Sequence, residues 1–563
     1  MYKFLCKDNR YESYQYVETS TFQHIETIDK TPKELKLFAN DIFDYDGVTK
    51  EFKLIHSNLK SNTMIPGILD LTMTHGKEQK KFLYLCKPDD KRIPFFLIPY
   101  NKQLGFDKSV KKIYITYSFK HWIYERPYGT MTQNLGSVDV LHHYYEYILY
   151  CKSLNVSIQQ FTKETKQKLK YRSNVEIIDT ITEKYNFETR HIKNYYIFTL
   201  DSESSNDYDD ALSYCIKEKK LSIYISNVAI IMDFLELWHS FSNRVSTIYL
   251  PDKKRTMLPS ILIDFLCSLK EKNYKLCYVL DLWFDDKNEI KSHSFTCCKA
   301  YIAKNVFYEK MGNFECREDV KAMLSILRLK HLKQVVTKLM LLFNNMIAKD
   351  LYPHEHGVYK TLHQQSPDEI QNIDIPRSVY EHICVVKNKA SQYCAYRKDI
   401  IYQSKIHKGI DAYAQASSPI RRLVDLLNNI AMMNVLTPYG LSDTSTEFYR
   451  HWICDENIEN INITSRAIRK IQSKCFIYEM YEKNREHQHV YKGYVFDKAY
   501  KPGDGKYQYM VYIEPLHLTT YITLVEDVEN FSCHYFSLYV FMSEENDKKK
   551  IKLQLCYENK ERM

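Results

Sequence analysis

Four aspartates lie close together in the stretch TLDSESSNDYDDALSY, residues 199–214. They are Asp201, Asp207, Asp209 and Asp210. The apolar segments on both sides would bury the ends of this loop, and burying several carboxylates without a cation costs free energy. Carboxylate oxygens are the ligands that Mg²⁺, Mn²⁺ and Ca²⁺ prefer. The cluster therefore predicts a divalent-cation site, with a solvated turn capped by aspartates as the alternative.

The spacing of the four acids narrows the kind of metal site. It lacks the glycine and the terminal glutamate of an EF-hand loop. Two magnesium ions about 4 Å apart can activate water and stabilise the leaving oxygen of a phosphodiester. We therefore expect magnesium that acts on a phosphate group, with Mn²⁺ as a substitute ion.

The segment AYAQASSPIRRLVD, residues 412–425, offers cations for such a phosphate. We expect Ser418 and Pro419 to begin a helix, whose N-terminus favours an anion. Arg421 and Arg422 would then lie in its first turns, where a cation is unfavourable unless it faces an anionic partner. Pairing of these arginines with structural acids such as Asp425 is the alternative.

Histidines and cysteines give weaker signals. The pairs His354/His356 and His487/His489 have no second ligand cluster at a telling spacing, so we expect surface or core histidines there. The 15 cysteines include no C-x-x-C pair. This pattern indicates reduced thiols without a disulfide partner, and Cys297–Cys298 is interpreted as packing.

The elements around the aspartates are predicted to be strands. The apolar run 194–200 leads into the acidic loop, and strands over 211–216 and 221–229 follow it, joined by the charged turn 217–220. Helical spacing appears in 318–351, 417–436 and 464–488. The acids would therefore lie in a loop between two buried strands.

Outside this region the chain alternates between short strands and helices. Short strands over 65–136 and from 490 onward are typical of small antiparallel barrels. Helices are predicted over 137–155, with Ser137 as its cap, and over 157–172. Residues 1–60 are polar and irregular, with a short helix expected over 31–43.

Length and composition are those of an ordinary globular protein. The chain has 563 residues, enough for about three or four domains, and is 44% hydrophobic and 26% charged. It has no long uncharged apolar window and no apolar core for a secretory signal near its start. We therefore expect no membrane span and an intracellular protein, in the cytoplasm or the nucleus.

Charge and aromatic content are compatible with nucleic-acid binding and do not by themselves show it. The net charge of +9 is a mild excess that allows a local basic groove. Aromatic residues make up 14% of the chain, with 48 tyrosines. Exposed rings among cations would suit stacking on single-stranded bases, although a strand-rich chain also uses many tyrosines.

The aspartate cluster resembles the signature of the RNB exoribonucleases, the family of RNase II, RNase R and the exosome's catalytic subunit. That signature is T-[IL]-D, five residues, then D-x-D-D-A. Three further blocks resemble the family in the same order: RVSTIYLPDKKRTMLPSIL (244–262), LCSLKEKN (266–273) and HKGIDAYAQASSPIRRLVD (407–425). Together the blocks cover roughly residues 194–488.

The resemblance implies a multidomain α+β fold in which an RNB catalytic domain is flanked by small OB-type β-barrels. It divides the chain into an N-terminal region with a degenerate or absent first cold-shock barrel, a cold-shock-like barrel, a helical connector, the RNB domain and an S1-type barrel. The corresponding ranges are 1–63, 64–138, 139–190, 191–488 and 489–563.

The resemblance also implies an activity. It is magnesium-dependent, processive hydrolysis of single-stranded RNA from the 3′ end to 5′-mononucleotides, with a short end product. Single-stranded RNA is the partner expected, and the protein is expected to be a monomer.

Individual roles are carried over from the family's motifs. Asp201, Asp207 and Asp210 would hold metal, and Asp209 would join them as the acid most needed for cleavage. Arg421 would grip the scissile phosphate. Tyr249 would meet the terminal bases, unless it is a core tyrosine. The other expected RNA contacts are Arg244, Tyr413, Ser418 and Arg422.

Three positions depart from the family pattern. Asn227 replaces a common aspartate, Leu423 replaces a tyrosine, and Gln472 aligns with a glutamate found in RNase II. These departures bear on the grip on RNA and on the length of the end product.

A catalytically silent RNB-like protein that binds RNA or a partner is the alternative function. Inactive members usually lose acids from the cluster, so the intact aspartates and Arg421 argue against it. Endonucleolytic cutting has no sequence feature here.

Overall fold

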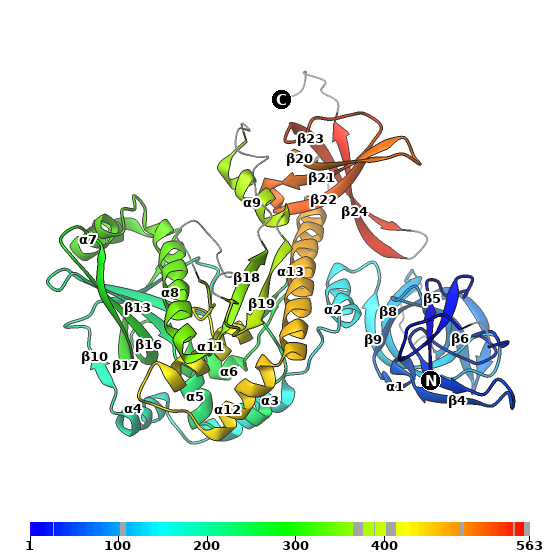
Figure 1. The fold of residues 1–563 in the computed structure, drawn as a ribbon, viewed down its shortest axis with the longest axis horizontal. Helices are drawn as coiled ribbons and strands as arrows, with labels where there is room; N and C mark the ends of the chain where they lie inside the picture. Colours follow the sequence, from blue (N-terminus) through cyan, green and yellow to red (C-terminus); the bar gives the residue numbers. More distant parts are fainter. Residues whose placement is uncertain are drawn as a thin grey trace.

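The computed structural model describes residues 1–25, 28–101, 109–363, 375–387, 389–400, 412–484, 489–543 and 547–556. Figure 1 shows an N-terminal β-structure, a large central α+β body and a C-terminal β-sheet. This is the multidomain α+β fold expected from the sequence, with OB-type β-structures on both sides of the central body. Within the described residues, no helix combines the length and the apolar character needed to cross a bilayer.

The N-terminal residues form a four-stranded sheet in the order β2-β1-β3-β4. Its strands are β1 (Tyr2–Cys6), β2 (Tyr14–Glu18), β3 (Ile42–Tyr45) and β4 (Phe52–His56). The helix expected over 31–43 is wrong, because this stretch consists of turns followed by β3. Lys36 and Asn40 have φ values of 52° and 70°, a left-handed conformation that interrupts a helix.

The next five strands close into a barrel in the order β5-β6-β7-β9-β8. They are β5 (Ile65–Glu78), β6 (Lys81–Pro88), β7 (Phe96–Tyr100), β8 (Lys112–His121) and β9 (Tyr128–Ser137). The short helix α1 (Asn58–Ser61) precedes them. One hydrophobic core contains Phe4 and Phe43 from the N-terminal sheet together with Phe96 and Tyr117 from the barrel. The two β-structures therefore pack as one unit.

Three helices connect the barrel to the central body. They are α2 (Leu141–Cys151), α3 (Gln159–Leu169) and α4 (Asn174–Tyr185). Ser137 ends β9, and the cap position of α2 is Val140, so the expected cap at Ser137 is wrong. Helix α4 begins with a capping box, in which Ser173 and Glu176 satisfy each other's backbone N–H groups.

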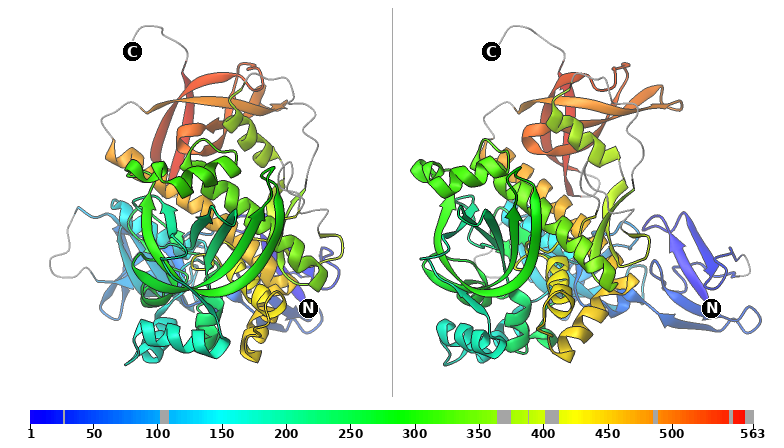
Figure 2. Two further views of the ribbon diagram at one scale, coloured as in Figure 1. Left: turned by 90° about the vertical axis from the view of Figure 1, so that its left-hand side faces the viewer. Right: turned by 60° about the vertical axis from the view of Figure 1, so that its left-hand side comes forward.

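The central sheet has the order β10-β17-β11-β12-β13-β16. Its strands are β10 (Glu188–Arg190), β11 (Ile197–Asp201), β12 (Asp210–Cys215), β13 (Lys220–Ser226), β16 (Asn273–Phe284) and β17 (Ile290–Phe307). Strand β16 also pairs with β17, so the sheet curls back on itself (Figure 2). Every residue of β13 is buried, as expected of a strand covered on both faces.

Helices pack against this sheet and form the largest hydrophobic core. They are α5 (Val228–Phe234), α6 (Ser260–Leu262), α7 (Glu318–Ile326), α8 (Val335–Leu351), α11 (Leu423–Val435), α12 (Asp443–Ile453) and α13 (Asp455–Lys483). The single helix expected over 318–351 is two helices, because Arg328 has a φ of 52° that ends the first one. Two strand pairs lie among them: β14 (Ile248–Tyr249) with β15 (Lys254–Arg255), and β18 (Val358–His363) with β19 (Lys389–Ala395).

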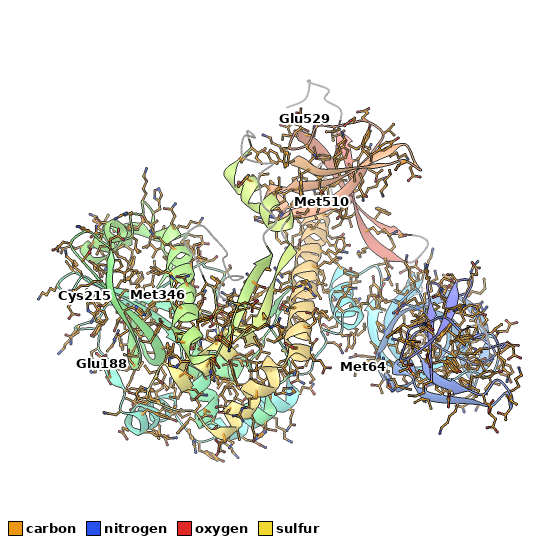
Figure 3. The ribbon with its side chains drawn as sticks, in the orientation of Figure 1. Met64, Glu188, Cys215, Met346, Met510 and Glu529 are labelled. Atoms are coloured by element: carbon orange, nitrogen blue, oxygen red, sulfur yellow. The ribbon has the colours of Figure 1, made fainter. Side chains whose placement is uncertain are left out.

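The C-terminal sheet has the order β22-β21-β20-β23-β24. Its strands are β20 (Val490–Lys501), β21 (Lys506–Ile513), β22 (Leu518–Leu524), β23 (Cys533–Ser543) and β24 (Lys548–Cys556). Helix α9 (Arg377–Lys387) packs on it through Val379 and Ile383. In Figure 3, Met510 marks this sheet and Met64 marks the start of the N-terminal barrel.

The end of the β23–β24 hairpin contacts the N-terminal barrel. The Asp547 carboxylate accepts hydrogen bonds from Lys87 Nζ at 2.8 Å and from Lys112 Nζ at 2.5 Å. Lys548 Nζ lies 2.7 Å from a carboxylate oxygen of Asp89. These ion pairs fix the C-terminal sheet to the barrel.

Candidate active site

The acidic loop lies between two neighbouring strands of the central sheet, as predicted. Asp201 is the last residue of β11, and Asp210 is the first residue of β12. These strands are antiparallel, with Phe198 opposite Leu212. This register places Asp201, at the end of β11, beside Asp209 and Asp210, where β12 begins.

Asp209 connects the acidic loop to the arginine segment. Its side chain is buried, and Oδ1 accepts a hydrogen bond from the backbone N–H of Ile420 at 2.9 Å. Oδ2 accepts one from Nε of Arg421, also at 2.9 Å. Two segments more than two hundred residues apart in sequence thus meet at this one carboxylate.

Burial and the proximity of other carboxylates raise the pKa values of Asp201, Asp209 and Asp210. Burial, with the neighbouring Asp209 charge, raises the pKa of Asp201 to about 7. Burial, with the charges of Asp201 and Asp209, raises the pKa of Asp210 to about 8. Burial raises the pKa of Asp209 to about 6, although the Arg421 guanidinium opposes this shift. A bound cation would relieve these costs.

Asp207 is placed differently from the other three aspartates. Its carboxylate is 6% exposed, and both of its oxygens accept hydrogen bonds from Nζ of Lys254, at 2.8 and 2.9 Å. Lys254 lies on β15, directly opposite Tyr249 on β14. The β14–β15 hairpin thus brings an ammonium group to one of the predicted metal ligands.

The arginine segment does not begin a helix where the sequence suggested. Helix α11 begins at Leu423, after Arg422 in an extended conformation with φ −138° and ψ 128°. Backbone pairing with residues 245–247 prevents an earlier start, since Thr247 N–H donates to Arg421 O and Leu423 N–H donates to Val245 O. Arg421 and Arg422 therefore precede the helix.

The two arginines have different partners. One of them pairs with the acidic loop, and the other pairs with a structural acid. Nε of Arg421 donates to Asp209, and its Nη2 donates to Ser418 Oγ at 3.0 Å. Nη2 of Arg422 donates to the fully buried Asp425 at 2.8 Å, which is the structural pairing named as the alternative. Nε of Arg422 is buried and has no hydrogen-bond partner among the described residues.

A cavity of about 310 Å³ opens beside these arginines. Arg421, Arg422, Lys360 and Arg469 contribute cations to its lining, and no carboxylate is among the described residues that line it. Its polar and apolar neighbours are Val245, Ser246, Thr247, Tyr249, Ser391, Tyr393, Gln415, Val424, Ser465, Ile468 and Gln472. A positive cavity with two tyrosines suits an anionic ligand that carries aromatic bases.

Tyr249 lines this cavity and is not a core residue. Its side chain is 44% exposed. Its backbone N–H donates to Oε1 of Gln472 at 2.8 Å, so α13 holds the β14–β15 hairpin at the cavity. Gln472, one of the departures from the family pattern, therefore positions Tyr249.

Other residues expected to contact RNA lie outside the cavity lining. Arg244 donates to the backbone carbonyls of Val156 at 2.8 Å and Thr256 at 2.6 Å, which ties two loops together. Tyr413 is buried, and its hydroxyl accepts from Asn344 Nδ2 at 3.1 Å. Ser418 is also buried and supports Arg421. Their surroundings are those of structural residues.

The two remaining departures also have structural roles. Asn227 is buried and caps α5, with Oδ1 accepting from Ile230 N–H at 3.2 Å. Leu423 is fully buried in the main core.

Sequence reasoning missed three cations of the site. Lys254 pairs with Asp207, 47 residues away in sequence, and Lys360 lies on a strand paired with the distant β19, so no local pattern marks either lysine. Arg469 had a signal, because residues 465, 468, 469 and 472 are spaced to share one face of α13.

No group of three or more His, Cys, Asp or Glu side chains is arranged to hold a metal ion within the part of the chain that is described. His354 and His356 contact each other, with Nδ1 of His356 2.6 Å from the carbonyl oxygen of His354. His407 and His487 lie outside the described residues.

Comparison with known proteins relates part of this chain to one protein family. The RNB domain family matches residues 189–339. Ribonuclease R of Aquifex aeolicus (strain VF5) is 28% identical over 146 residues, which are 25% of this chain and 21% of that relative. The chain therefore covers about a fifth of that curated relative's length.

Solved structures share the fold over nearly the whole chain. Mycoplasma genitalium RNase R, in complex with ribose methylated single-stranded RNA, has a TM-score of 0.66 at 15% identity, over 98% of this chain and 96% of that one. Yeast Ssd1, a pseudonuclease, has a TM-score of 0.55 at 13% identity, over 91% of this chain and 72% of that one. Residues 189–339, which carry the aspartate cluster, are therefore an RNB domain.

Proposed function

We propose that this protein is a 3′-to-5′ exoribonuclease that hydrolyses single-stranded RNA to 5′-mononucleotides, with Mg²⁺ or Mn²⁺ as its cofactor. One observation carries the proposal: the Asp209–Arg421 contact joins a buried acidic cluster to a cationic cavity. The first would hold a cation and the second a polyanion, and phosphodiester hydrolysis requires both in one place.

The cavity offers contacts that recognise RNA without regard to sequence. Arg422, Lys360 and Arg469 would neutralise phosphates, and the partnerless Nε of Arg422 would gain an acceptor. Tyr249 and Tyr393 present rings on which bases can stack. Because phosphates and base faces are common to all sequences, this lining supports a broad substrate range and stepwise, processive movement of the strand.

Arg421 is placed to contact the scissile phosphate. Asp209 and Ser418 hold its Nε and Nη2, which fixes the plane of the guanidinium. The remaining N–H groups are then oriented before the substrate arrives. Such preorganisation stabilises charge that develops on a phosphoryl oxygen during hydrolysis.

The chemistry of the carboxylates beside Arg421 fits a divalent cation, although no three of the described His, Cys, Asp and Glu side chains are gathered around one point. Asp201 and Asp210 have pKa values raised by burial and by the charges of neighbouring aspartates, which a hard cation would reverse. Asp209 lies next to them. Such an ion would supply charge neutralisation and a more acidic water at the scissile phosphate. Asp207 fits less well, since Lys254 already holds both of its oxygens.

A silent RNA-binding protein is the second candidate. The Lys254–Asp207 pair favours it, because it removes one predicted ligand from a set of four. The fold shared with the pseudonuclease Ssd1 is compatible with it.

Hydrolysis of 5′-labelled single-stranded RNA with Mg²⁺ separates the two candidates. The wild-type protein should shorten the RNA from its 3′ end and leave a short labelled fragment, whereas Asp209→Asn and an EDTA-treated sample should leave it whole. Asp286→Asn, at a fully exposed carboxylate, serves as the matched control and should cut normally. RNA that is bound and stays intact with both Mg²⁺ and Mn²⁺ would establish the silent protein. Cleavage of a circular RNA would instead reveal an endonuclease.

A further inference from the structure

The β23–β24 hairpin continues beyond the C-terminal sheet as a two-stranded ribbon. Strand β20 pairs with β23 only as far as Ser537, whereas β23 and β24 pair from Tyr535 to Ser543. An isolated two-stranded ribbon is marginally stable in water, so this one needs support. Figure 1 shows it reaching from the C-terminal sheet towards the N-terminal barrel.

One face of the ribbon is packed, and both of its ends are held. Val540, Met542 and Ile551 pack against the main core, and Tyr478 of α13 donates a hydrogen bond to the backbone carbonyl of Lys549 at 2.8 Å. At the far end, Asp547 is bound by the two lysines of the barrel, as described above. The ribbon is therefore a rigid bridge between the two β-structures.

The other face carries three aromatic rings in a row. Side chains alternate along a strand, so Tyr535, Tyr539 and Phe541 all lie opposite the packed face. They are 40%, 45% and 43% exposed. Tyr539 and Phe541 are next neighbours on this face, about 6.8 Å apart, whereas Ser537 separates Tyr535 from Tyr539, so each ring can be contacted separately.

Lysines lie beside these rings. In the cross-strand register, Lys552 is opposite Tyr539, and Lys550 is opposite Phe541. On the other side, Lys492 of β20 is opposite Tyr535. All three lysines are exposed, and no acidic residue occupies a paired position in these rows. Directly opposed side chains are close enough to bind one ligand together.

We propose that this outer face of the ribbon, formed by Tyr535, Tyr539, Phe541, Lys492, Lys550 and Lys552, binds single-stranded RNA outside the catalytic cavity. The rings stack on bases, and the lysines neutralise phosphates. The choice of RNA rests on the proposed function. The face lies on the fourth and fifth strands of the C-terminal sheet, whereas OB-folds use mainly their second and third strands to bind nucleic acids. Because its ends are fixed, the face loses little conformational entropy on binding.

A length-dependent binding experiment tests this proposal. The full chain carrying Asp209→Asn, which binds without cutting, is titrated by fluorescence anisotropy with a labelled six-nucleotide RNA and a labelled thirty-nucleotide RNA. Tyr539→Ser with Phe541→Ser, and separately Lys550→Gln with Lys552→Gln, should weaken binding of the long RNA about fivefold to a hundredfold. The short RNA, bound by the cavity alone, should be unaffected. The lysine pair should also flatten the salt dependence for the long RNA.

The control is Tyr171→Ser, at an exposed ring between α3 and α4 and away from both β-structures, which should change neither affinity. Crosslinking of wild-type protein to 4-thiouridine RNA, mapped to β23, would support the proposal without any substitution. Unchanged affinity for the long RNA, or equal losses for both lengths, would overturn it. Loss of self-association with unchanged RNA affinity would also overturn it, by assigning the face to a second copy of the chain.

The experiments can disprove the RNA-binding role of the ribbon and the proposed exoribonuclease function independently of each other. If wild-type protein cuts short RNA while the ribbon variants bind long RNA normally, only the ribbon assignment is wrong. If the long RNA binds through the ribbon and no RNA is cut, the exoribonuclease assignment is wrong and the RNA face remains.

Discussion

At the scale of single residues, the site depends on which carboxylates are already neutralised by protein cations. Asp209 is bound by Arg421, and Asp207 is bound by Lys254, whereas Asp201 and Asp210 repel each other. The same residue type therefore serves two purposes within one loop. The first pair of acids positions cations, and the second pair remains for a metal ion.

The Lys254–Asp207 pair yields a prediction about metal binding. Lys254→Gln removes the ammonium from a carboxylate that is 6% exposed, so Asp207 becomes a free oxygen donor. We expect tighter or additional binding of Mn²⁺, followed by its EPR signal, and a loss of about 1–3 kcal/mol of stability without metal. Lys270→Gln, which affects a lysine paired with the exposed Asp264, is the control. Unchanged Mn²⁺ binding in Lys254→Gln would show that the lysine does not restrict Asp207.

The raised pKa values yield a prediction about stability. The pKa of Asp210 is about 8 in the folded protein, against an ordinary value of 3.8. Between these values the unfolded chain releases a proton that the folded chain retains, so metal-free stability falls as pH rises from about 4 to about 8. Asp210→Asn abolishes this loss, and we expect it to stabilise the metal-free protein by about 1–3 kcal/mol at pH 8 and by little at pH 5.

Chemical denaturation at the two pH values, in the presence of EDTA, measures this effect. Asp286→Asn should show no such gain, because that carboxylate is fully exposed. Equal stability of Asp210→Asn and wild-type protein at pH 8 would contradict the assigned repulsion.

At the scale of elements, the β14–β15 hairpin is the part that brings the site together. It carries Tyr249 to the cavity and Lys254 to the acidic loop, and α13 holds it through Gln472. A two-residue strand pair has little stability of its own, so its position depends on these side-chain contacts.

Two substitutions of Gln472 separate its role in positioning Tyr249 from the effect of a charge at this place in the cavity. Gln472→Leu removes the acceptor for Tyr249 N–H, and we expect a KM for RNA raised about threefold to tenfold, with a smaller change in kcat. Gln472→Glu keeps the acceptor and adds a negative charge to a cavity lined by cations. It should restore the position of Tyr249 and flatten the dependence of KM on salt. If both variants behave like the wild type, Gln472 does not position Tyr249.

Much of this arrangement could be predicted from local sequence, and the rest could not. The aspartate loop was predicted because apolar strands flank it directly. The start of α11 was misplaced because distant backbone pairing with residues 245–247 overrides the local cap signal of Ser418 and Pro419. Lys254, Lys360 and the ribbon depend on contacts between segments far apart in sequence, which no local periodicity records.

At the scale of the whole molecule, the ion pairs of Asp547 connect the two β-structures that flank the central body. Burial raises the pKa of this carboxyl, but the hydrogen bonds from Lys112 and Lys87 outweigh that effect and lower it. A lowered pKa means that the contact is at full strength above the ordinary carboxyl pKa and is lost as pH falls through the folded value. The connection is therefore intact at neutral pH.

Asp547→Asn is predicted to loosen the connection without unfolding either part. Two lysines would lose their counter-ion, and we expect the distance between spin labels on the barrel and on the C-terminal sheet to broaden in pulsed EPR. Lys120→Gln, which breaks the ion pair with Glu78 on the same barrel, should leave the distance distribution narrow. A narrow distribution in Asp547→Asn would show that the packed face and the Lys548–Asp89 ion pair are enough to hold the ribbon.

The contact between Lys87 and Asp547 spans 460 residues of sequence. During synthesis the barrel leaves the ribosome long before its partner hairpin exists, and domains generally fold as they emerge. The barrel therefore folds first, and its lysines stay exposed to solvent while the central sheet forms. The bridge can therefore close only after β24 has been made, and a chain that stops before β24 would be expected to keep its central sheet while its two flanking β-structures stay unlinked.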